Sequence, residues 1–374
     1  MHRRTSHLVG ALGIVLALVA TACTSAEDPS ASPAGESTTQ ATAVLPDESP
    51  SPSPTASEPS SPEPTDESES PEPSETVTRA PRPVSLPAYF DKDYNGGGLR
   101  IGRTLLETAT YTEYYVTYRS GSLRISGRLN VPKQRGPHPA VVLAHGYIDP
   151  AYYVNGQGLT RERGWLAEAG FVTLHTDYRN HAGSSQAPRS EERLRLGYTE
   201  DVINAVLALR ATKDVRIDDD RIGLLGRSMG GGVVYNVLAV APGLVDAGIA
   251  FAPVSSRTAD NFNRFTRGDD DPGDDATADA ILRRFGEPRD NPRFWREVSP
   301  RTYFDRVTEP VLIHHGSSDD TCPIRWSTAT TRAMKQAGVA VRMRTYVGEE
   351  HAFGPQFNLS MARSVGFLRQ HLRG

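Results

Sequence analysis

The fold is decided by the stretch Leu224-Leu225-Gly226-Arg227-Ser228-Met229-Gly230-Gly231-Gly232. It places Gly-x-Ser-x-Gly between an apolar segment, predicted as a strand over 222–225, and a predicted helix over 230–241. A turn this tight tolerates only Gly at its two flanking positions, and it lifts the central hydroxyl clear of the sheet. The sequence therefore predicts Ser228 as a nucleophile. The Met229 amide, at the helix N-terminus, is predicted to stabilise the negative charge that develops on the substrate.

Short apolar strands alternate with helical segments on both sides of this turn. We expect a hairpin from 111–118 and 123–131, further strands at 140–144, 171–176, 247–251, 311–314 and 341–347, and helices at 159–169, 199–210, 324–337 and 358–372. Thr199 is the expected N-terminal cap of its helix. Continuous apolar strands alternating with helices predict the α/β class, with a mostly parallel sheet covered by helices on both faces.

An acid and a base follow the serine in the order that this kind of turn requires. Asp319 lies in the loop after the predicted strand 311–314, and His351 lies in the loop after 341–347. Parallel strands deliver both loops to the same sheet edge as Ser228. We predict that Asp319 accepts the Nδ1 proton of His351, and that Nε2 of this histidine takes the Ser228 proton. Asp320 is the neighbouring alternative to Asp319.

The second donor of an oxyanion hole is expected in the loop after 140–144, which reads His145-Gly146-Tyr147. Gly146 lets this backbone approach the substrate closely. We predict the Tyr147 amide as the donor, with the side chain of His145 or Tyr147 as the alternative.

The remaining polar residues of these loops have simpler interpretations. Three other histidines are expected to be packed and hydrogen-bonded, two glutamates to be solvated loop charges, and one cysteine to replace a small apolar residue: His175, His181, His314, Glu349, Glu350 and Cys322. No grouping has metal-ligand spacing, so no metal is expected.

Residues 255–300 interrupt the alternation of strands and helices. We expect them to lie over the carboxyl ends of the strands as a lid or specificity element. The acidic run 268–275 could be a calcium loop, but its spacing matches no known calcium motif, and a solvated loop is the preferred interpretation.

The first residues resemble a secretory leader. Arg3 and Arg4 precede the 13-residue apolar run Leu8–Ala20, which is too short to span a bilayer. Ala20-Thr21-Ala22-Cys23 then resembles a bacterial lipobox. We predict a signal peptide over 1–22, a lipid on Cys23, and a location outside the cytoplasm, anchored to the bacterial membrane. The alternative is a secreted protein cleaved near Ala22.

A tether is predicted over 23–87, ahead of one folded domain over 88–374. Residues 24–78 hold 11 prolines and 12 acidic residues but no Lys or Arg, a composition typical of disordered segments. Residues 79–374 carry 39 Lys and Arg against 33 Asp and Glu, a balance too weak to suggest nucleic acid as a partner. Two cysteines in 374 residues exclude a disulfide-stapled scaffold.

Over about residues 113–372 the chain resembles the catalytic domain of the prolyl oligopeptidase family of α/β-hydrolases. The resemblance rests on the following residues in consistent order: Asn130-Val131-Pro132, His145-Gly146, Asp177-Tyr178-Arg179, Gly183, Asp201, Gly226–Gly230, Ser299–Tyr303, His315-Gly316, Asp319, Pro323, Gly348 and His351-Ala352-Phe353. It implies an α/β-hydrolase fold, a triad of Ser228, Asp319 and His351, and no cofactor.

The expected function is a cell-surface serine hydrolase that works through an acyl-enzyme on small peptides. Carboxylesterase activity on small esters is the alternative, because stand-alone relatives of this shape often cleave esters. A tethered binding protein on a hydrolase scaffold is less expected, since no triad member is missing. Acyl transfer to a wall glycan or lipid is permitted by a location outside the cytoplasm, but no residue requires it.

Overall fold

The computed structural model of this protein describes residues 80–267 and 272–372, with the side chains of 272–275 left out. The predicted leader, the lipidation site Cys23 and residues 23–79 of the tether lie outside the described residues. Within the described part, the strands are β1 (Gly97–Glu107), β2 (Tyr111–Ser120), β3 (Leu123–Pro132), β4 (His138–Ala144), β5 (Val172–Thr176), β6 (Ile217–Arg227), β7 (Ala247–Phe251), β8 (Val311–Gly316) and β9 (Val341–Tyr346).

The α-helices among these residues are α1 (Thr160–Glu168), α2 (Gly197–Ala211), α3 (Met229–Val240), α4 (Thr258–Asn261), α5 (Pro272–Phe285), α6 (Pro292–Glu297), α7 (Ile324–Gln336) and α8 (Phe357–His371). Short helical turns η1 (Pro87–Tyr89), η2 (Phe262–Thr266) and η3 (Pro300–Arg306) complete them.

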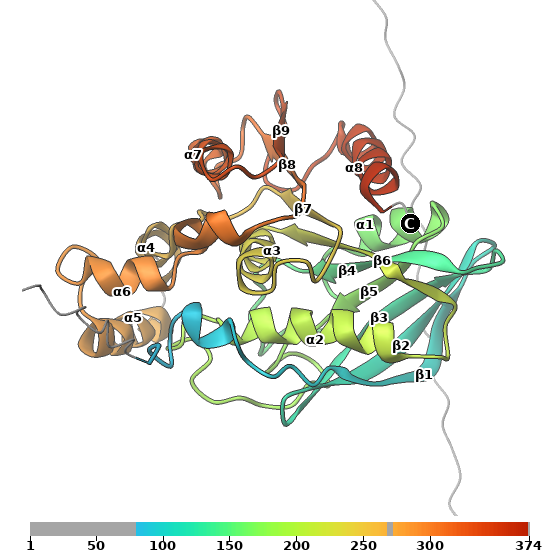
Figure 1. The fold of residues 1–374 in the computed structure, drawn as a ribbon, viewed down its shortest axis with the longest axis horizontal. Coiled ribbons are helices and arrows are strands. Elements are labelled where there is room, and N and C mark those ends of the chain that lie inside the picture. Colours follow the sequence, from blue (N-terminus) through green and yellow to red (C-terminus); the bar gives the residue numbers. More distant parts are fainter. Residues whose placement is uncertain (1–79, 268–271, 373–374) are drawn as a thin grey trace, which may run out of the picture. The chain divides into compact units, whose positions relative to one another are not determined.

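The strands form one sheet in the order β1-β2-β3-β5-β4-β6-β7-β8-β9 (Figure 1). Strands β5, β4, β6, β7, β8 and β9 run parallel, and the hairpin β2–β3 continues the sheet antiparallel from β5. The predicted α/β class with a mostly parallel sheet is confirmed. Because the loops after β4, β6, β8 and β9 leave the same edge, the residues predicted for the site meet there.

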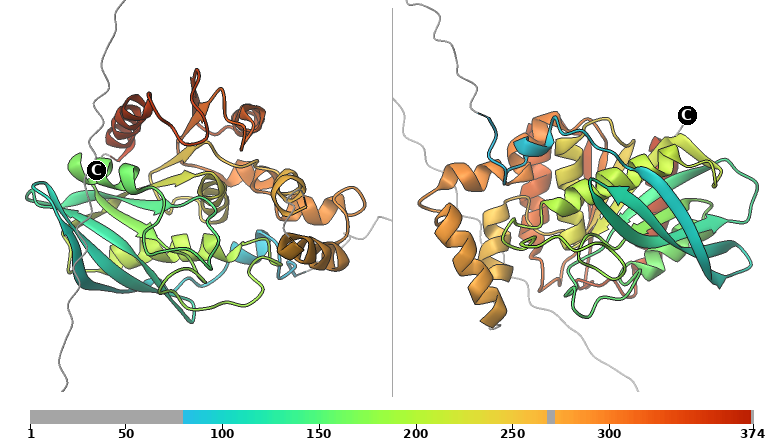
Figure 2. Two further views of the ribbon diagram at one scale, coloured as in Figure 1. Left: turned by 180° about the vertical axis from the view of Figure 1, so that it is seen from behind. Right: turned by 90° about the horizontal axis from the view of Figure 1, so that it is seen from below.

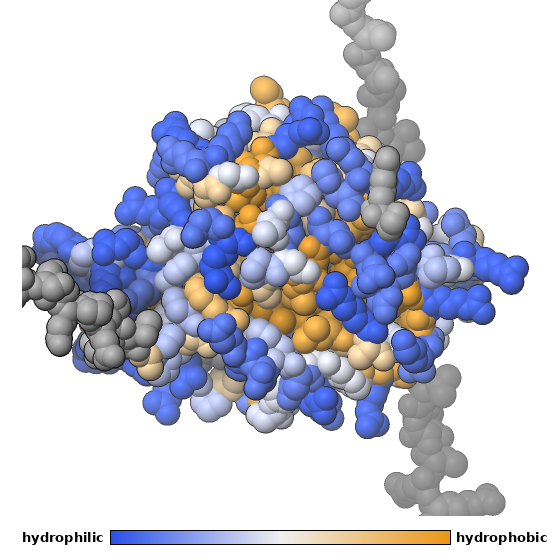
Figure 3. Space-filling model, in the orientation of Figure 1, coloured by the Kyte–Doolittle hydropathy of each residue, from blue (hydrophilic) through white to orange (hydrophobic). Residues whose placement is uncertain are grey.

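Helices cover both faces of the sheet, as Figure 2 shows from two further sides. Alternate residues of β4 divide between the two cores: Val142 packs with the cluster that contains α2 and α3, whereas Val141 and Leu143 pack with the cluster that contains α1 and α8. Side chains of successive strand residues point to opposite faces, so a strand buried on both sides must be apolar throughout. In the space-filling view, apolar side chains show mainly toward the middle and hydrophilic ones toward the rim (Figure 3).

Three local predictions need correction. Strand β1 was not predicted; it pairs antiparallel with β2, and its exposed residues hide the alternation that identifies a strand. Helix α2 begins at Gly197, so Thr199 lies inside it, buried, rather than at its N-terminus. The acidic run 268–275 is not a loop throughout, because α5 begins at Pro272; residues 268–271 lie outside the described residues.

The folded domain begins before the predicted boundary at residue 88, because residues that were assigned to the tether pack against it. Val84 and Leu86 are buried in the core, and the Leu86 amide donates a hydrogen bond of 3.0 Å to the Glu297 carbonyl. Across residues 80–267 and 272–372, no helix combines the length and the apolar character needed to cross a bilayer.

Candidate active site

Ser228 occupies the turn between β6 and α3 in a strained conformation. Its φ of 57° and ψ of −123° are unusual for a residue with a side chain. The flanking glycines make the turn possible: a Cβ at Gly230 would lie 1.9 Å from the Ala144 carbonyl oxygen, and one at Gly226 would lie 2.2 Å from the Gly230 oxygen. The turn is also tied to β7, because the Ser228 amide donates to the Phe251 carbonyl at 3.0 Å. The local geometry predicted for residues 226–230 is therefore present.

The structure brings Asp319 and His351 together. Nδ1 of His351 lies 3.0 and 3.1 Å from the two carboxylate oxygens of Asp319. A nitrogen facing a carboxylate carries the proton, which leaves Nε2 of His351 as the basic nitrogen. Asp320, the neighbouring alternative, is exposed and contacts Thr321 instead.

Asp319 has a second imidazole partner that the sequence analysis did not assign. Nε2 of His315 lies 3.2 Å from Oδ2 of Asp319 and 2.8 Å from the Cys322 carbonyl, while its Nδ1 lies 2.7 Å from the Ser327 hydroxyl. Burial by itself would raise the pKa of Asp319. Hydrogen bonds from His315, His351 and the Cys322 amide outweigh burial and hold this pKa well below its usual range. The carboxylate therefore stays ionised.

The loop that carries His351 is organised by Glu349, which the sequence analysis treated as a solvated charge. That interpretation is wrong: Glu349 is 2% exposed, and its carboxylate accepts hydrogen bonds from the Gly354 and Gln356 amides. Its backbone carbonyl also accepts a 3.0 Å bond from the Ser318 amide, in the loop of Asp319. Glu350, in contrast, is exposed as expected.

The loop after β4 passes directly beside the serine. A Cβ at Gly146 would lie 3.2 Å from the Ser228 Cβ and 3.8 Å from its Oγ. Tyr147 and Met229 both border the cavity at Ser228. The His145 side chain does not suit the alternative role of donor, because it is fully buried and its Nδ1 faces the Gly146 carbonyl at 2.6 Å. The assignment of the Tyr147 and Met229 amides remains a prediction.

One cavity of about 360 Å³ contains both Ser228 and His351 in its lining. The insertion 255–300 supplies part of its lining, in which the apolar side chains of Phe262, Phe265 and Ile281 lie beside Ser, Thr and Asn residues. These three apolar residues come from η2 and α5. The expected position of the insertion, at the carboxyl edge of the sheet, agrees with this arrangement.

Cys322 is buried next to this cavity, as expected for a residue that replaces a small apolar side chain. Burial raises the pKa of its thiol to about 12; the Asp319 carboxylate adds to this shift, and hydrogen bonding to the Ser228 side chain opposes it. The thiol therefore stays protonated at neutral pH.

The three histidines that were expected to be packed, His175, His181 and His314, are buried. His314 contacts the Tyr346 and Ser364 hydroxyls at 2.7 and 3.0 Å, and His181 contacts two backbone carbonyls. His175 differs from the expectation, because neither ring nitrogen has a hydrogen-bond partner among the described residues. Burial lowers its pKa well below the usual value, so the ring is neutral. No group of His, Cys, Asp or Glu able to hold a metal occurs in the described part of the chain.

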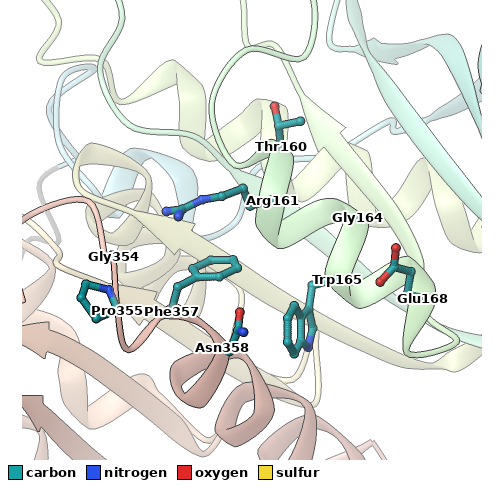
Figure 4. A pocket seen from close by; sticks show the side chains of 9 residues that line it. All are labelled: Thr160, Arg161, Gly164, Trp165, Glu168, Gly354, Pro355, Phe357 and Asn358. Atoms are coloured by element: carbon teal, nitrogen blue, oxygen red, sulfur yellow. The ribbon is translucent and has the colours of Figure 1, made fainter. Parts of the chain in front are cut away.

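A separate hollow of about 490 Å³ lies between α1 and the chain leading into α8 (Figure 4). Arg161 and Phe357 stack across it, with the guanidinium carbon 4.1 Å from the ring centre, and Trp165 packs edge-on against the same ring. None of Ser228, Asp319 and His351 lines this hollow. Arg161 donates a hydrogen bond of 2.8 Å to the Phe353 carbonyl, two residues beyond His351, and this contact connects the hollow to the loop of the site.

The parallel sheet, the strained serine turn and the Asp–His pair at one edge together define an α/β-hydrolase with a serine-centred site. Residues 158–374 match the prolyl oligopeptidase family, and the chain belongs to that family. The resemblance seen in the sequence is thereby confirmed.

Relatives with peptidase names are among the similar proteins. Dipeptidyl aminopeptidase BIII of Pseudoxanthomonas mexicana is 26% identical over 278 residues, which are 72% of this chain and 37% of the relative. The uncharacterized peptidase YtmA of Bacillus subtilis is 24% identical over 261 residues, 67% of this chain and 91% of that protein. The solved dipeptidyl peptidase 4 of Porphyromonas gingivalis shares the fold, with a TM-score of 0.56, 22% identity, and coverage of 70% of this chain and 36% of that one. The chain thus spans little more than a third of the Pseudoxanthomonas and Porphyromonas proteins.

Proposed function

We propose that this protein is a serine hydrolase that cleaves small peptides through an acyl-enzyme, with Ser228 as nucleophile, His351 as general base and Asp319 as its partner. The observation that carries this proposal is the contact of Asp319 with Nδ1 of His351, at 3.0 Å, beside a cavity that also contains Ser228. Membership of the prolyl oligopeptidase family supports the peptidase assignment.

The reaction follows from these positions. Nε2 of His351 takes the proton as the Ser228 oxygen forms a bond to the substrate carbonyl carbon, and the carbonyl oxygen becomes an oxyanion. The Met229 and Tyr147 amides stabilise that charge. The imidazolium, held by ionised Asp319, then protonates the leaving amine as its bond to carbon breaks. Water attacks the acyl-enzyme in the same way, which releases the acid and restores the serine.

Ester substrates are the second candidate, supported by the apolar side chains that line part of the cavity. A short ester needs little more than an apolar pocket, whereas a peptide requires recognition of its backbone or a terminus. A panel of Ala- and Pro-p-nitroanilides beside p-nitrophenyl esters of graded chain length would separate the two activities.

A fluorophosphonate probe tests the proposal independently of the substrate. We expect the wild-type chain to be labelled and Ser228→Ala to remain unlabelled. Labelling that persists in Ser228→Ala would refute Ser228 as the nucleophile. A folded wild-type protein that neither reacts nor turns over any compound of the panel would refute the hydrolase assignment and favour a binding protein on this scaffold.

The leader sequence supports a further proposal, that a lipid on Cys23 anchors the domain outside the cytoplasm. Metabolic labelling with radioactive palmitate should mark the wild-type chain and not Cys23→Ala. Release of unlabelled wild-type protein into the medium would favour the secreted alternative.

A further inference from the structure

A strained segment borders the cavity that contains Ser228: residues 189–196, which lead into α2. Leu194 and Arg195 both have a φ of 54°, and Arg189 has 60°, in the left-handed region that side chains disfavour. Hydrogen bonds hold this conformation, from the Leu194 amide to the Glu191 carbonyl at 2.8 Å and from the Arg195 amide to the Ser190 carbonyl at 3.0 Å. Strained backbone that its surroundings hold in place is concentrated at active sites and ligand-binding segments.

The side chain aimed by this strain is Arg195. It borders the same cavity as Ser228 and is 26% exposed. Its guanidinium carbon lies 4.4 Å from the centre of the Tyr147 ring, which covers one face of the planar group. Its Nε faces the Glu191 carboxylate as an ion pair. The guanidinium is thus held in place before any substrate binds.

Arg195 is also distinctive in charge. Among the described residues that line this cavity, Arg195 carries the positive formal charge and Glu191 the negative one. His351, the proposed general base, also lines it. Oε2 of Glu191 pairs with Nε of Arg195, and Oε1 of Glu191 accepts a hydrogen bond of 3.5 Å from the Tyr198 hydroxyl. A guanidinium has five N–H donors, and the contact of Nε with Glu191 is an ion pair that makes no hydrogen bond among the described residues. The group can therefore present further donors to a planar anion.

We propose that Arg195 binds a carboxylate of the substrate, so that this site prefers acyl compounds that carry an anionic group close to the scissile bond. This inference rests on the proposed hydrolase function. Glu191 acts as a competitor, because it occupies the guanidinium when no anionic substrate is present. Removal of the competitor should strengthen the preference, and removal of Arg195 should abolish it.

Two acyl groups that differ by one carboxymethyl group provide the test: N-succinyl-alanine and N-acetyl-alanine, each as p-nitroanilide and as p-nitrophenyl ester. A charge-assisted pair predicts that kcat/KM of the wild type favours the succinyl compound roughly tenfold or more. Arg195→Gln should bring this ratio close to one, Arg195→Lys should retain part of it, and Glu191→Gln should raise it above the wild-type value. Increasing salt should lower the ratio in the wild type.

Arg193→Gln is the matched control, because Arg193 is exposed and lies two residues away. It should keep the wild-type ratio, and fluorophosphonate labelling with a thermal melt verifies that each variant is folded. Turnover and labelling without a succinyl preference, or a preference that survives Arg195→Gln, would overturn this inference alone. If Ala-p-nitroanilide, which has a free amine, is preferred over the succinyl and acetyl compounds and this preference depends on Glu191, the inference is wrong and the site recognises an amino terminus. Loss of turnover and labelling altogether in the wild type would overturn the proposed function as well.

Discussion

His315 Nε2 lies 3.2 Å from Oδ2 of Asp319, the same oxygen that lies 3.0 Å from Nδ1 of His351. The carboxylate therefore joins two histidines with different environments: His315 is fully buried, whereas the His351 side chain is 24% exposed at the cavity. Because Nε2 of His315 faces two acceptors, the Asp319 carboxylate and the Cys322 carbonyl, this nitrogen donates and keeps Asp319 in a fixed orientation, while Nδ1 lies at the Ser327 hydroxyl.

The first prediction concerns the choice between two adjacent aspartates. Asp319→Asn should lower kcat by about 10³–10⁴-fold with little change in KM, because an amide can stabilise the wrong tautomer of His351. Asp320→Asn is the matched control and should stay within about twofold, since Asp320 is exposed. Steady-state kinetics on the best p-nitroanilide or ester decide this, and a larger effect at position 320 would reverse the assignment.

The second prediction is that His315 positions Asp319. His315→Ala should lower kcat and the fluorophosphonate labelling rate by about tenfold, and it should cost about 1–3 kcal/mol in the free energy of unfolding, because buried partners are left unsatisfied. His315→Gln offers a donor near the Nε2 position and should recover part of kcat. Equal loss of kcat in both variants, at equal stability, would mean that the ring only fills space.

A third prediction links Asp319 to acid stability. Its pKa is lower in the folded protein than the value near 3.9 of an unfolded chain. Its ionised form therefore stabilises the folded state above about pH 4, and this contribution is lost as the pH falls below that value. Urea unfolding between pH 3 and 7 should show a lower free energy for Asp319→Asn at pH 7 and a shallower decline on acidification than for the wild type. Parallel curves would contradict the depressed pKa.

A fourth prediction tests the corrected role of Glu349. Glu349→Ala leaves the Gly354 and Gln356 amides without their buried acceptor, so the free energy of unfolding should fall by about 1–3 kcal/mol. The loop that carries His351 loosens, and kcat should fall severalfold. Glu350 is exposed, so Glu350→Ala should change the free energy of unfolding by less than about 0.5 kcal/mol. Comparable effects at both positions would show that the loop does not depend on Glu349.

The fifth prediction is that Cys322 is chemically inert in the folded protein. With a pKa of about 12, its thiolate is a tiny fraction at pH 8, and the thiolate is the reactive form. Iodoacetamide should modify Cys322 slowly in the native protein and rapidly in urea, as measured by peptide mapping that separates it from Cys23. Fast native modification at a rate equal to that in urea would show an exposed, ionised thiol.

The features that the sequence determined by itself are those carried by local pattern. The Gly-x-Ser-x-Gly turn is set by sterics within five residues, and the apolar runs that make β4 to β8 are visible because both faces of a parallel sheet are buried. The convergence of Ser228, Asp319 and His351 was also predictable, because each residue follows a parallel strand and parallel strands end at one edge of the sheet.

Only the tertiary structure decided which charges are buried and what they contact. Glu349 and Glu350 are identical in sequence terms, yet one is buried against two loop amides and the other faces solvent. His315 reaches Asp319 through a loop that folds back, Arg195 is aimed by left-handed residues that no propensity predicts, and β1 is held by pairing with β2 rather than by its own pattern. These are contacts between segments far apart in the chain or conformations imposed by packing, and local periodicity carries no information about them.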